Sequence, residues 1–222
     1  MISSQTSVPH RKASDASPVC KHFFRKAAAS ALLTLAFLAS TTRAHASTNL
    51  TPGEMGIADS NPVGQSYHLK LHHLHTNESI DVIYRIGGTY LPAAMDKLNY
   101  FLRDHRTEDQ SHYDPTEFDL LHNLLGKLGK PNAVVDIVCG YRTPWSNNFL
   151  RTRSANTGVA KNSQHTLAKA IDIRVPGTTT RKLRDMALSL QAGGVGYYPL
   201  SKFVHVDVGP VRAWTFRGRG DD

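Results

Sequence analysis

The sequence contains only two cysteines, Cys20 and Cys139. Cys20 falls within an N-terminal segment that has the composition of a removable leader, so Cys139 would be alone in the mature chain. An internal disulfide is thereby excluded. Cys139 ends the apolar run 134–139, where a small thiol side chain is typical of a core position. The alternative, a nucleophile activated by a neighbouring histidine, remains open.

The chain also lacks an apolar run long enough to cross a bilayer, which needs about 20 residues. The apolar stretch 27–40 is shorter, follows basic residues at positions 21–26, and precedes the small-x-small triplet Ala44-His45-Ala46. This order is typical of a secretory signal peptide. We therefore predict a signal peptide over residues 1–46, cleaved after Ala46, with retention as a membrane anchor as the alternative. The basic segment has no clear twin-arginine pair, so the export route is left open.

Basic character is scarce once the leader is set aside. The formal charge of the whole sequence is +8, but six basic residues and one acidic residue lie in 1–46. The mature chain therefore carries 20 basic and 17 acidic side chains, a net charge of +3. It has no block of Lys and Arg with interleaved aromatic residues, and no internal repeat. A nucleic-acid-binding role is not expected.

The mature chain divides into three segments. Residues 47–66 are rich in Gly, Pro, Asn and Ser and are predicted to form a flexible leader, and residues 217–222 a disordered tail. Between them, apolar runs and alternation predict strands at 67–74, 79–86, 134–139, 170–175, 193–198, 203–208 and 211–216. Apolar residues at helical spacing predict helices at 91–105, 115–128, 145–154 and 178–190.

Candidate ligands gather in two of these strands and in the loop before the first. His165 and Asp172 are seven positions apart, and His205 lies thirty-three positions after Asp172. Side chains alternate along a strand, so Asp172 faces away from its isoleucine neighbours and His205 away from its valine neighbours. If the two strands are neighbours in a sheet, Asp172 and His205 converge, and the preceding loop supplies His165.

Two histidines and one carboxylate leave a fourth coordination position for water, which is the pattern of a catalytic zinc site. Zinc lowers the pKa of that water from about 15.7 to about 7, so that it can attack a carbonyl carbon. We therefore predict that His165, Asp172 and His205 hold one zinc ion in a hydrolase. The alternative for His205 is a hydrogen-bonded core residue that binds no metal.

Five motifs in this order resemble the YcbK-like branch of the LAS superfamily of zinc metallopeptidases: 99–106, 140–142, 163–172, 193–198 and 204–207. The superfamily also contains lysostaphin-type and D-Ala-D-Ala peptidases and hedgehog. The similarity extends over 67–214. Members of the YcbK-like branch are exported murein peptidases of Gram-negative bacteria, so the resemblance implies a periplasmic protein.

The resemblance implies an α+β fold, with a small central antiparallel sheet flanked by helices, in a zinc peptidase-like domain over 67–216. It also implies one zinc ion at His165, Asp172 and His205. The expected reaction is hydrolysis of peptide cross-links between stem peptides of peptidoglycan, including the diaminopimelate–diaminopimelate type. The alternatives are a D-Ala carboxypeptidase of the same superfamily and a non-catalytic zinc-containing module that binds peptidoglycan. Protein partners are not predicted.

Three positions differ from other branches of the superfamily. The D-Ala-D-Ala branch usually carries glycine where this chain has Ala168, and a general-base carboxylate where it has Lys202. The lysostaphin branch carries a histidine where this chain has Phe203. Because neither base is present, Asp207, on the same strand face as His205, is the predicted catalytic base. Its alternative role is to accept a hydrogen bond that orients a metal ligand.

Three further residues are predicted to bind the substrate. By resemblance, Arg142 matches the substrate-side arginine of the family, and its planar guanidinium can bind a stem-peptide carboxylate bidentately. Ser163 and Gln164 could donate hydrogen bonds to the scissile carbonyl as charge develops on its oxygen. The alternatives are a surface turn for Arg142 and a loop-capping role for Ser163.

Overall fold

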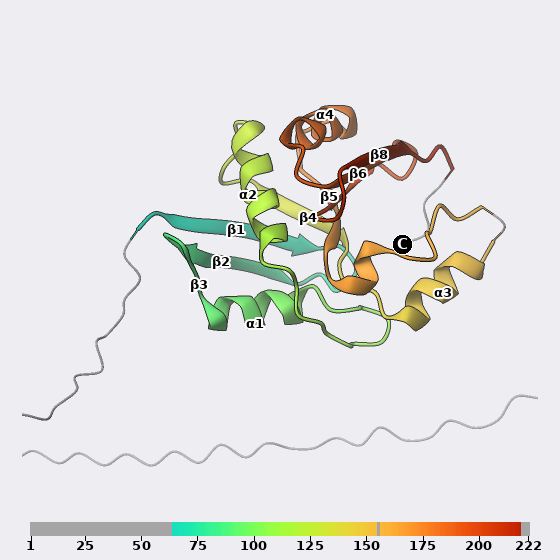
Figure 1. Ribbon diagram of the computed structural model, residues 1–222, viewed down its shortest axis with the longest axis horizontal. Helices are drawn as coiled ribbons and strands as arrows, with labels where there is room; N and C mark the ends of the chain where they lie inside the picture. Colours follow the sequence, from blue (N-terminus) through green and yellow to red (C-terminus); the bar gives the residue numbers. More distant parts are fainter. Residues whose placement is uncertain (1–63, 155, 219–222) are drawn as a thin grey trace, which may run out of the picture. The chain divides into compact units, whose positions relative to one another are not determined.

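Figure 1 shows the computed structural model of the chain, in which residues 64–154 and 156–218 are described. The predicted signal peptide, 1–46, lies outside the described residues, as do most of the predicted leader and the last four residues of the predicted tail. All described residues belong to one compact unit, Ile57–Asp222. None of the helices among them is long and apolar enough to cross a membrane.

Eight strands form one sheet in the order β3-β2-β1-β4-β5-β7-β6-β8. The strands are β1 (Ser66–His73), β2 (Ser79–Ile86), β3 (Thr89–Tyr90), β4 (Val134–Cys139), β5 (Ala170–Arg174), β6 (Gly194–Tyr198), β7 (Phe203–Asp207) and β8 (Arg212–Thr215). The α+β class is confirmed. The sheet is larger than the small antiparallel sheet expected, and it is mixed, because β1 pairs with β4 and β6 with β8 in parallel. Parallel pairing needs a long connection, which the helices between β1 and β4 supply.

Four α-helices accompany the sheet: α1 (Pro92–Phe101), α2 (Thr116–Lys127), α3 (Pro144–Thr152) and α4 (Thr180–Leu190). In Figure 1, α2 and α4 lie side by side over the sheet. Leu121 of α2 and Leu183 of α4 share one buried core with Ile171, Ile173 and Val204 of the sheet. Each such side chain contributes about 1.5–3 kcal/mol when fully buried. This core determines which face of β5 and β7 points toward the helices, so the alternate residues face the other way.

The turn after β4 is held by the segment that follows α1. The helix predicted over 91–105 ends four residues earlier, and the residues beyond it pack against this turn. The buried carboxylate of Asp104 accepts hydrogen bonds from the backbone N–H and the hydroxyl of Thr143, at 2.8 and 2.9 Å. A Cβ atom on Gly140 would lie 2.5 Å from the carbonyl oxygen of Leu102, so only glycine permits this approach. The backbone at 140–143 is therefore tightly placed.

Glu117, near the start of α2, is fully buried, and neither carboxylate oxygen has a hydrogen-bond partner in the described part of the chain. Burial is the main cause that raises its pKa well above the ordinary value, and the charges of Asp207, Asp114 and Asp172 raise it further. The folded protein therefore keeps this carboxyl protonated at pH values where the unfolded chain has lost the proton.

This carboxyl predicts a pH-dependent stability. Because the folded pKa is raised, the contribution of Glu117 is greatest below the unfolded pKa of about 4.3 and is lost as pH rises toward the folded pKa, by up to about 1.4 kcal/mol per pH unit. Glu117→Gln removes the titrating group. We expect the free energy of unfolding of the variant, relative to wild type, to increase as pH rises above the unfolded pKa in denaturant titrations. Parallel curves for the two proteins would contradict the assignment.

Candidate metal centre

The register between β5 and β7 brings Asp172 and His205 together. The two strands are antiparallel neighbours, and Asp172 lies directly opposite His205. Directly opposed residues share one face of a sheet, with Cβ atoms about 4.5–5.5 Å apart. The condition that the sequence left open, that these two strands are neighbours, is met, and Asp172 and His205 share the face opposite their isoleucine and valine neighbours.

His165 arrives from η1 (Gln164–Leu167), a short 3-10 helix that precedes β5. The hydroxyl of Ser163 caps this helix by accepting a hydrogen bond from the His165 N–H at 3.3 Å. The helix ends at Ala168, which is in the left-handed conformation with φ of 51°. Glycine adopts this conformation more readily than alanine. The backbone therefore explains why a glycine is usual in the D-Ala-D-Ala branch at this position.

Three potential ligand atoms form a tight triangle. His165 Nε2 lies 3.3 Å from Asp172 Oδ1 and 3.1 Å from His205 Nδ1. The third side, from His205 Nδ1 to Asp172 Oδ1, is 2.8 Å. A tetrahedral zinc site with ligands at about 2.0–2.1 Å separates its ligand atoms by about 3.3 Å. The three measured distances are close to this value, so one small divalent cation fits between the ligand atoms with little rearrangement. All three side chains are buried.

The far nitrogen of each imidazole is occupied by an acceptor. His165 Nδ1 donates to the carbonyl oxygen of Gly140 at 2.7 Å, and His205 Nε2 donates to Asp207 Oδ2 at 2.9 Å. Because a carbonyl and a carboxylate can only accept, the protons lie on these outer nitrogens. In the neutral rings, the inner nitrogens then present lone pairs toward Asp172 Oδ1, whereas a second proton on His205 Nδ1 would be donated to that oxygen, 2.8 Å away. Three acceptors that face one another are the arrangement that a shared metal cation satisfies.

The pKa shifts of His165 and Asp172 favour the forms that bind a metal, whereas the shift of His205 favours its proton. Burial is the main cause that lowers the pKa of His165 to about 4, and the charge of Arg142 lowers it further. Burial alone would raise the pKa of Asp172, but His165 and His205 hold it well below its ordinary value. Burial alone would lower the pKa of His205, whereas hydrogen bonds to Asp172 and Asp207 raise it. A neutral His165 and an ionised Asp172 are the forms that bind a cation, and His205 is the ligand for which a proton competes.

Asp207 is enclosed rather than facing the cavity. Its Oδ1 accepts hydrogen bonds from the N–H groups of Gly194 and Gly209, at 3.1 and 2.8 Å. Arg212 donates to Oδ1 at 3.1 Å and to Oδ2 at 2.7 Å, and His205 also donates to Oδ2. Burial alone would raise the pKa of Asp207, but His205 and Arg212 hold it well below the ordinary value. The carboxylate is fully buried and all its bonding positions are used.

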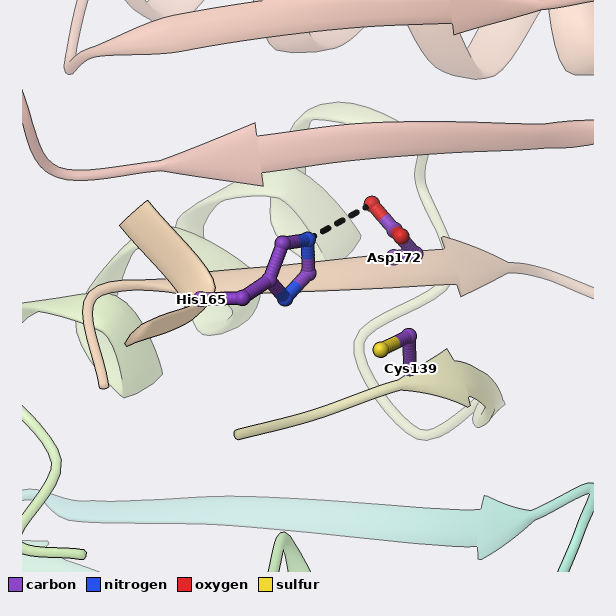
Figure 2. Close-up of side chains that lie close together, drawn as sticks. All are labelled: Cys139, His165 and Asp172. Atoms are coloured by element: carbon purple, nitrogen blue, oxygen red, sulfur yellow. Dashed lines mark ion pairs between the residues drawn. The ribbon is translucent and has the colours of Figure 1, made fainter. Parts of the chain in front are cut away.

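A thiol lies beside the same histidine. Figure 2 shows Cys139, from the end of β4, near the ring of His165, with a dashed ion pair that joins His165 to Asp172. The ligand atoms of Cys139, His165 and Asp172 lie within 4.8 Å of one another, so these three also form a possible metal site. His205 Nδ1 lies within 3.1 Å of both other ligand atoms, and in the neutral ring its proton is on the opposite nitrogen. The geometry therefore favours His205 as the third donor.

A cavity of about 90 Å³ opens beside these side chains. Its lining consists of Arg142, Thr157, Gly158, Val159, Ala160, Asn162, Ser163, Gln164, Asp172, Tyr198, Phe203, His205, Arg212 and Trp214. All three residues predicted to bind substrate line the cavity, whereas Asp207 does not. The volume holds a few water molecules but no peptide. Any larger ligand would therefore extend beyond the mouth of the cavity.

Arg142 is a buried cation that forms no ion pair with a residue described in the structure. Its side chain is 7% exposed, and Nη2 donates to Ser163 Oγ at 3.4 Å. Its Nε has no hydrogen-bond partner, and among residues 64–154 and 156–218 no carboxylate forms an ion pair with it. A buried guanidinium that lacks a counter-charge is unfavourable unless an anion binds. Arg142 is therefore poised to take an anionic group that enters the cavity.

Two groups at the site were not predicted from the sequence. The carbonyl of Gly140 orients His165, and the ring of Trp214 lies 5.1 Å from the ring of His205 and lines the cavity. A backbone carbonyl has no side-chain signal, although 140–142 was among the motifs recognised. Trp214 falls in the predicted last strand, and only the pairing of β8 with β6 shows that this strand reaches the site.

Comparison with known proteins identifies the family. The family model described as peptidoglycan L,D-endopeptidase MepK matches residues 61–214. Peptidoglycan L,D-endopeptidase MepK of Escherichia coli K12 is 47% identical over 146 residues, which are 66% of this chain and 79% of the relative. The probable peptidoglycan L,D-endopeptidase MepK of Haemophilus influenzae is 42% identical over 146 residues, 66% of this chain and 77% of the relative. No solved structure matches the chain significantly. The chain therefore belongs to the MepK family of peptidoglycan L,D-endopeptidases.

Proposed function

We propose that the protein is an exported zinc-dependent endopeptidase that hydrolyses L,D-configured peptide cross-links between stem peptides of peptidoglycan. The observation that carries this proposal is the triangle of ligand atoms from His165, Asp172 and His205 beside buried Arg142, which forms no ion pair within 64–154 and 156–218. The names of the relatives support the bond type and the substrate. The predicted signal peptide, cleaved after Ala46, supports export to the periplasm.

His165, Asp172 and His205 would hold the zinc ion. When bound, zinc would supply Lewis-acid chemistry and lower the pKa of water to about 7. The Gly140 carbonyl keeps the proton of His165 on Nδ1, and Asp207 keeps that of His205 on Nε2, so both ligand nitrogens stay free of protons. Asp207 thus positions a ligand, and we propose this role in place of the general-base role.

Arg142, Ser163 and Gln164 would bind the substrate. Arg142 is proposed to bind a stem-peptide carboxylate through its guanidinium, because that contact neutralises a buried cation. The Ser163 hydroxyl accepts from the His165 N–H, which leaves its own hydrogen available to a substrate carbonyl. Gln164 lines the same cavity, and its amide is a second donor for the scissile carbonyl.

A second candidate is the non-catalytic module that binds peptidoglycan. Of the described residues that line the cavity, only Asp172 carries a carboxylate, and it is a proposed metal ligand. No carboxylate of the cavity is therefore left to act as a general base. This observation keeps the non-catalytic module in competition with the endopeptidase.

Digestion of purified sacculi tests the proposal. The zinc-loaded exported protein is incubated with sacculi, and the soluble products are separated and identified by mass spectrometry. Chelator-treated protein is the control. Loss of muropeptide dimers joined through L,D bonds, only in the zinc-loaded sample, is the expected result. Release of D-Ala alone would indicate the carboxypeptidase instead. Sedimentation of the protein with sacculi without any released product would indicate the binding module.

A further inference from the structure

A shallow groove continues from the cavity across loop 156–162. The cavity and the groove share most of this loop together with Arg212 and Trp214. On its outer side the groove gains two cationic side chains, Arg151 at the end of α3 and Lys161 in the loop. A chain lying across the mouth of the cavity would therefore run onto this groove.

The groove and the cavity are strongly biased toward positive charge. Arg142, Arg151, Lys161 and Arg212 line them, against a single carboxylate, Asp172. Arg212 is neutralised by Asp207, but neither Arg151 nor Lys161 forms an ion pair with a described residue. Among the residues that the structure describes, Arg151 donates only to the amide oxygen of Asn148, at 2.9 Å. Arg151 and Lys161 are therefore two uncompensated cations in a groove that shares a wall with the cavity.

The loop between cavity and groove is tied down by neighbouring elements. Asn147 of α3 donates to the carbonyl oxygens of Ala160 and Lys161, at 3.0 and 3.5 Å. The buried Thr157 accepts from the N–H of Val159 at 3.3 Å. Gly158 has φ of 73°, and a Cβ there would lie 2.9 Å from the ring of Phe216. A groove whose wall is already ordered loses little entropy when a ligand binds.

We propose that this groove binds a second, acidic part of the peptide substrate, with Arg151 and Lys161 contacting a carboxylate remote from the scissile bond. The inference rests on the proposed function, because it takes the substrate to be a cross-linked peptide. Arg142 would bind one anionic group inside the cavity, and the groove would bind another outside it. Charge complementarity selects a carboxylate-bearing peptide strand, since the predicted mature chain has a net charge of only +3 and its sequence has no block of Lys and Arg with interleaved aromatic residues.

The test is steady-state kinetics of the zinc-loaded protein on a soluble stem-peptide dimer cross-linked through diaminopimelate. The dimer is prepared with its diaminopimelate carboxylates free and with them amidated. The groove variant is Arg151→Glu with Lys161→Glu, and Lys161→Glu alone, in an exposed loop, is the second variant. The matched control is Arg181→Glu with Lys182→Glu on α4, which makes the same change in charge on exposed residues away from the groove. Thermal unfolding verifies that all variants fold.

For the carboxylate dimer, the groove variant is expected to raise KM by about tenfold or more, with kcat within about twofold of wild type. The control is expected to match wild type, and the amidated dimer to show little difference between wild type, the two groove variants and the control. A KM equal to that of the control would overturn the inference. An equal rise in KM for the amidated dimer would overturn it as well.

Titration calorimetry with the same two dimers separates this inference from the proposed function. If wild type cleaves neither dimer, the proposed function fails, and the calorimetric binding of the dimers alone tests whether the groove binds a carboxylate. Weaker binding of the carboxylate dimer to the groove variant than to the control supports the groove. Equal binding to both, no binding to wild type, or equally tight binding of a DNA oligonucleotide of the same charge would each overturn it.

Discussion

His205→Ala is expected to yield a folded protein without zinc and to lower kcat/KM on cross-linked muropeptides by at least about 10³-fold. His205 Nδ1 lies 2.8 Å from Asp172 Oδ1 and 3.1 Å from His165 Nε2, so its removal leaves two protein ligands. Zinc sites in enzymes use three protein ligands and one open position. Two ligands are not expected to hold the ion through purification. Metal analysis of the purified variant and a sacculus digest provide the two measurements.

Cys139→Ala is the matched variant, because it removes the other candidate donor from the same buried region. It is expected to keep a full complement of zinc and activity within about threefold of wild type, since a small core side chain is exchanged for a slightly smaller one. The opposite pattern, with zinc lost from Cys139→Ala and retained by His205→Ala, would assign the donors to Cys139, His165 and Asp172. Circular dichroism of both variants excludes unfolding as the cause.

The meeting of Asp172 and His205 could be predicted because strand alternation is a rigid rule. Once the isoleucines of β5 and the valines of β7 are assigned to the core, the residues between them must share the opposite face. Pairing of the two strands was a condition that the sequence left open, and only the register of β5 with β7 supplies it. The loop position of His165 was expected only from its place just before β5, and its capping by Ser163 shows how the short helix aims the ring.

The remaining features depend on contacts distant in sequence. The parallel pairs β1–β4 and β6–β8 join segments separated by helices or by another strand, and local patterns carry no signal for such pairing. The same holds for Asp207, whose position on the strand predicted that it would face the site beside His205. Its engagement by Arg212 and by two backbone N–H groups could not be read from alternation. Strand alternation predicts on which face of the sheet a side chain lies, but not which other residues contact it there.

Asp207→Asn is expected to weaken zinc binding by about 10- to 100-fold, the typical effect of removing a partner that orients a metal-bound histidine. Asparagine has one acceptor oxygen, whereas Asp207 accepts five hydrogen bonds through two oxygens, including one from His205 and two from Arg212. With an amide nitrogen facing His205 Nε2, the imidazole can place its proton on Nδ1, the nitrogen that faces Asp172. The ligand form of His205 is then less populated. Asp185→Asn, an exposed carboxylate on α4, is the control and is expected to bind zinc as wild type does.

A zinc titration distinguishes this positioning role from general-base catalysis by Asp207. If Asp207 positions His205, kcat of Asp207→Asn recovers to within a few-fold of wild type when zinc is saturating, because the reacting groups themselves are intact. If Asp207 is the base, the variant retains zinc and kcat stays about 10²- to 10⁴-fold low at every zinc concentration. The structure favours recovery, since the carboxylate is fully buried, is bound to Arg212 and does not line the cavity where water and substrate must meet. A base has to reach the proton that it removes, and Asp207 is separated from the cavity by the imidazole that it holds.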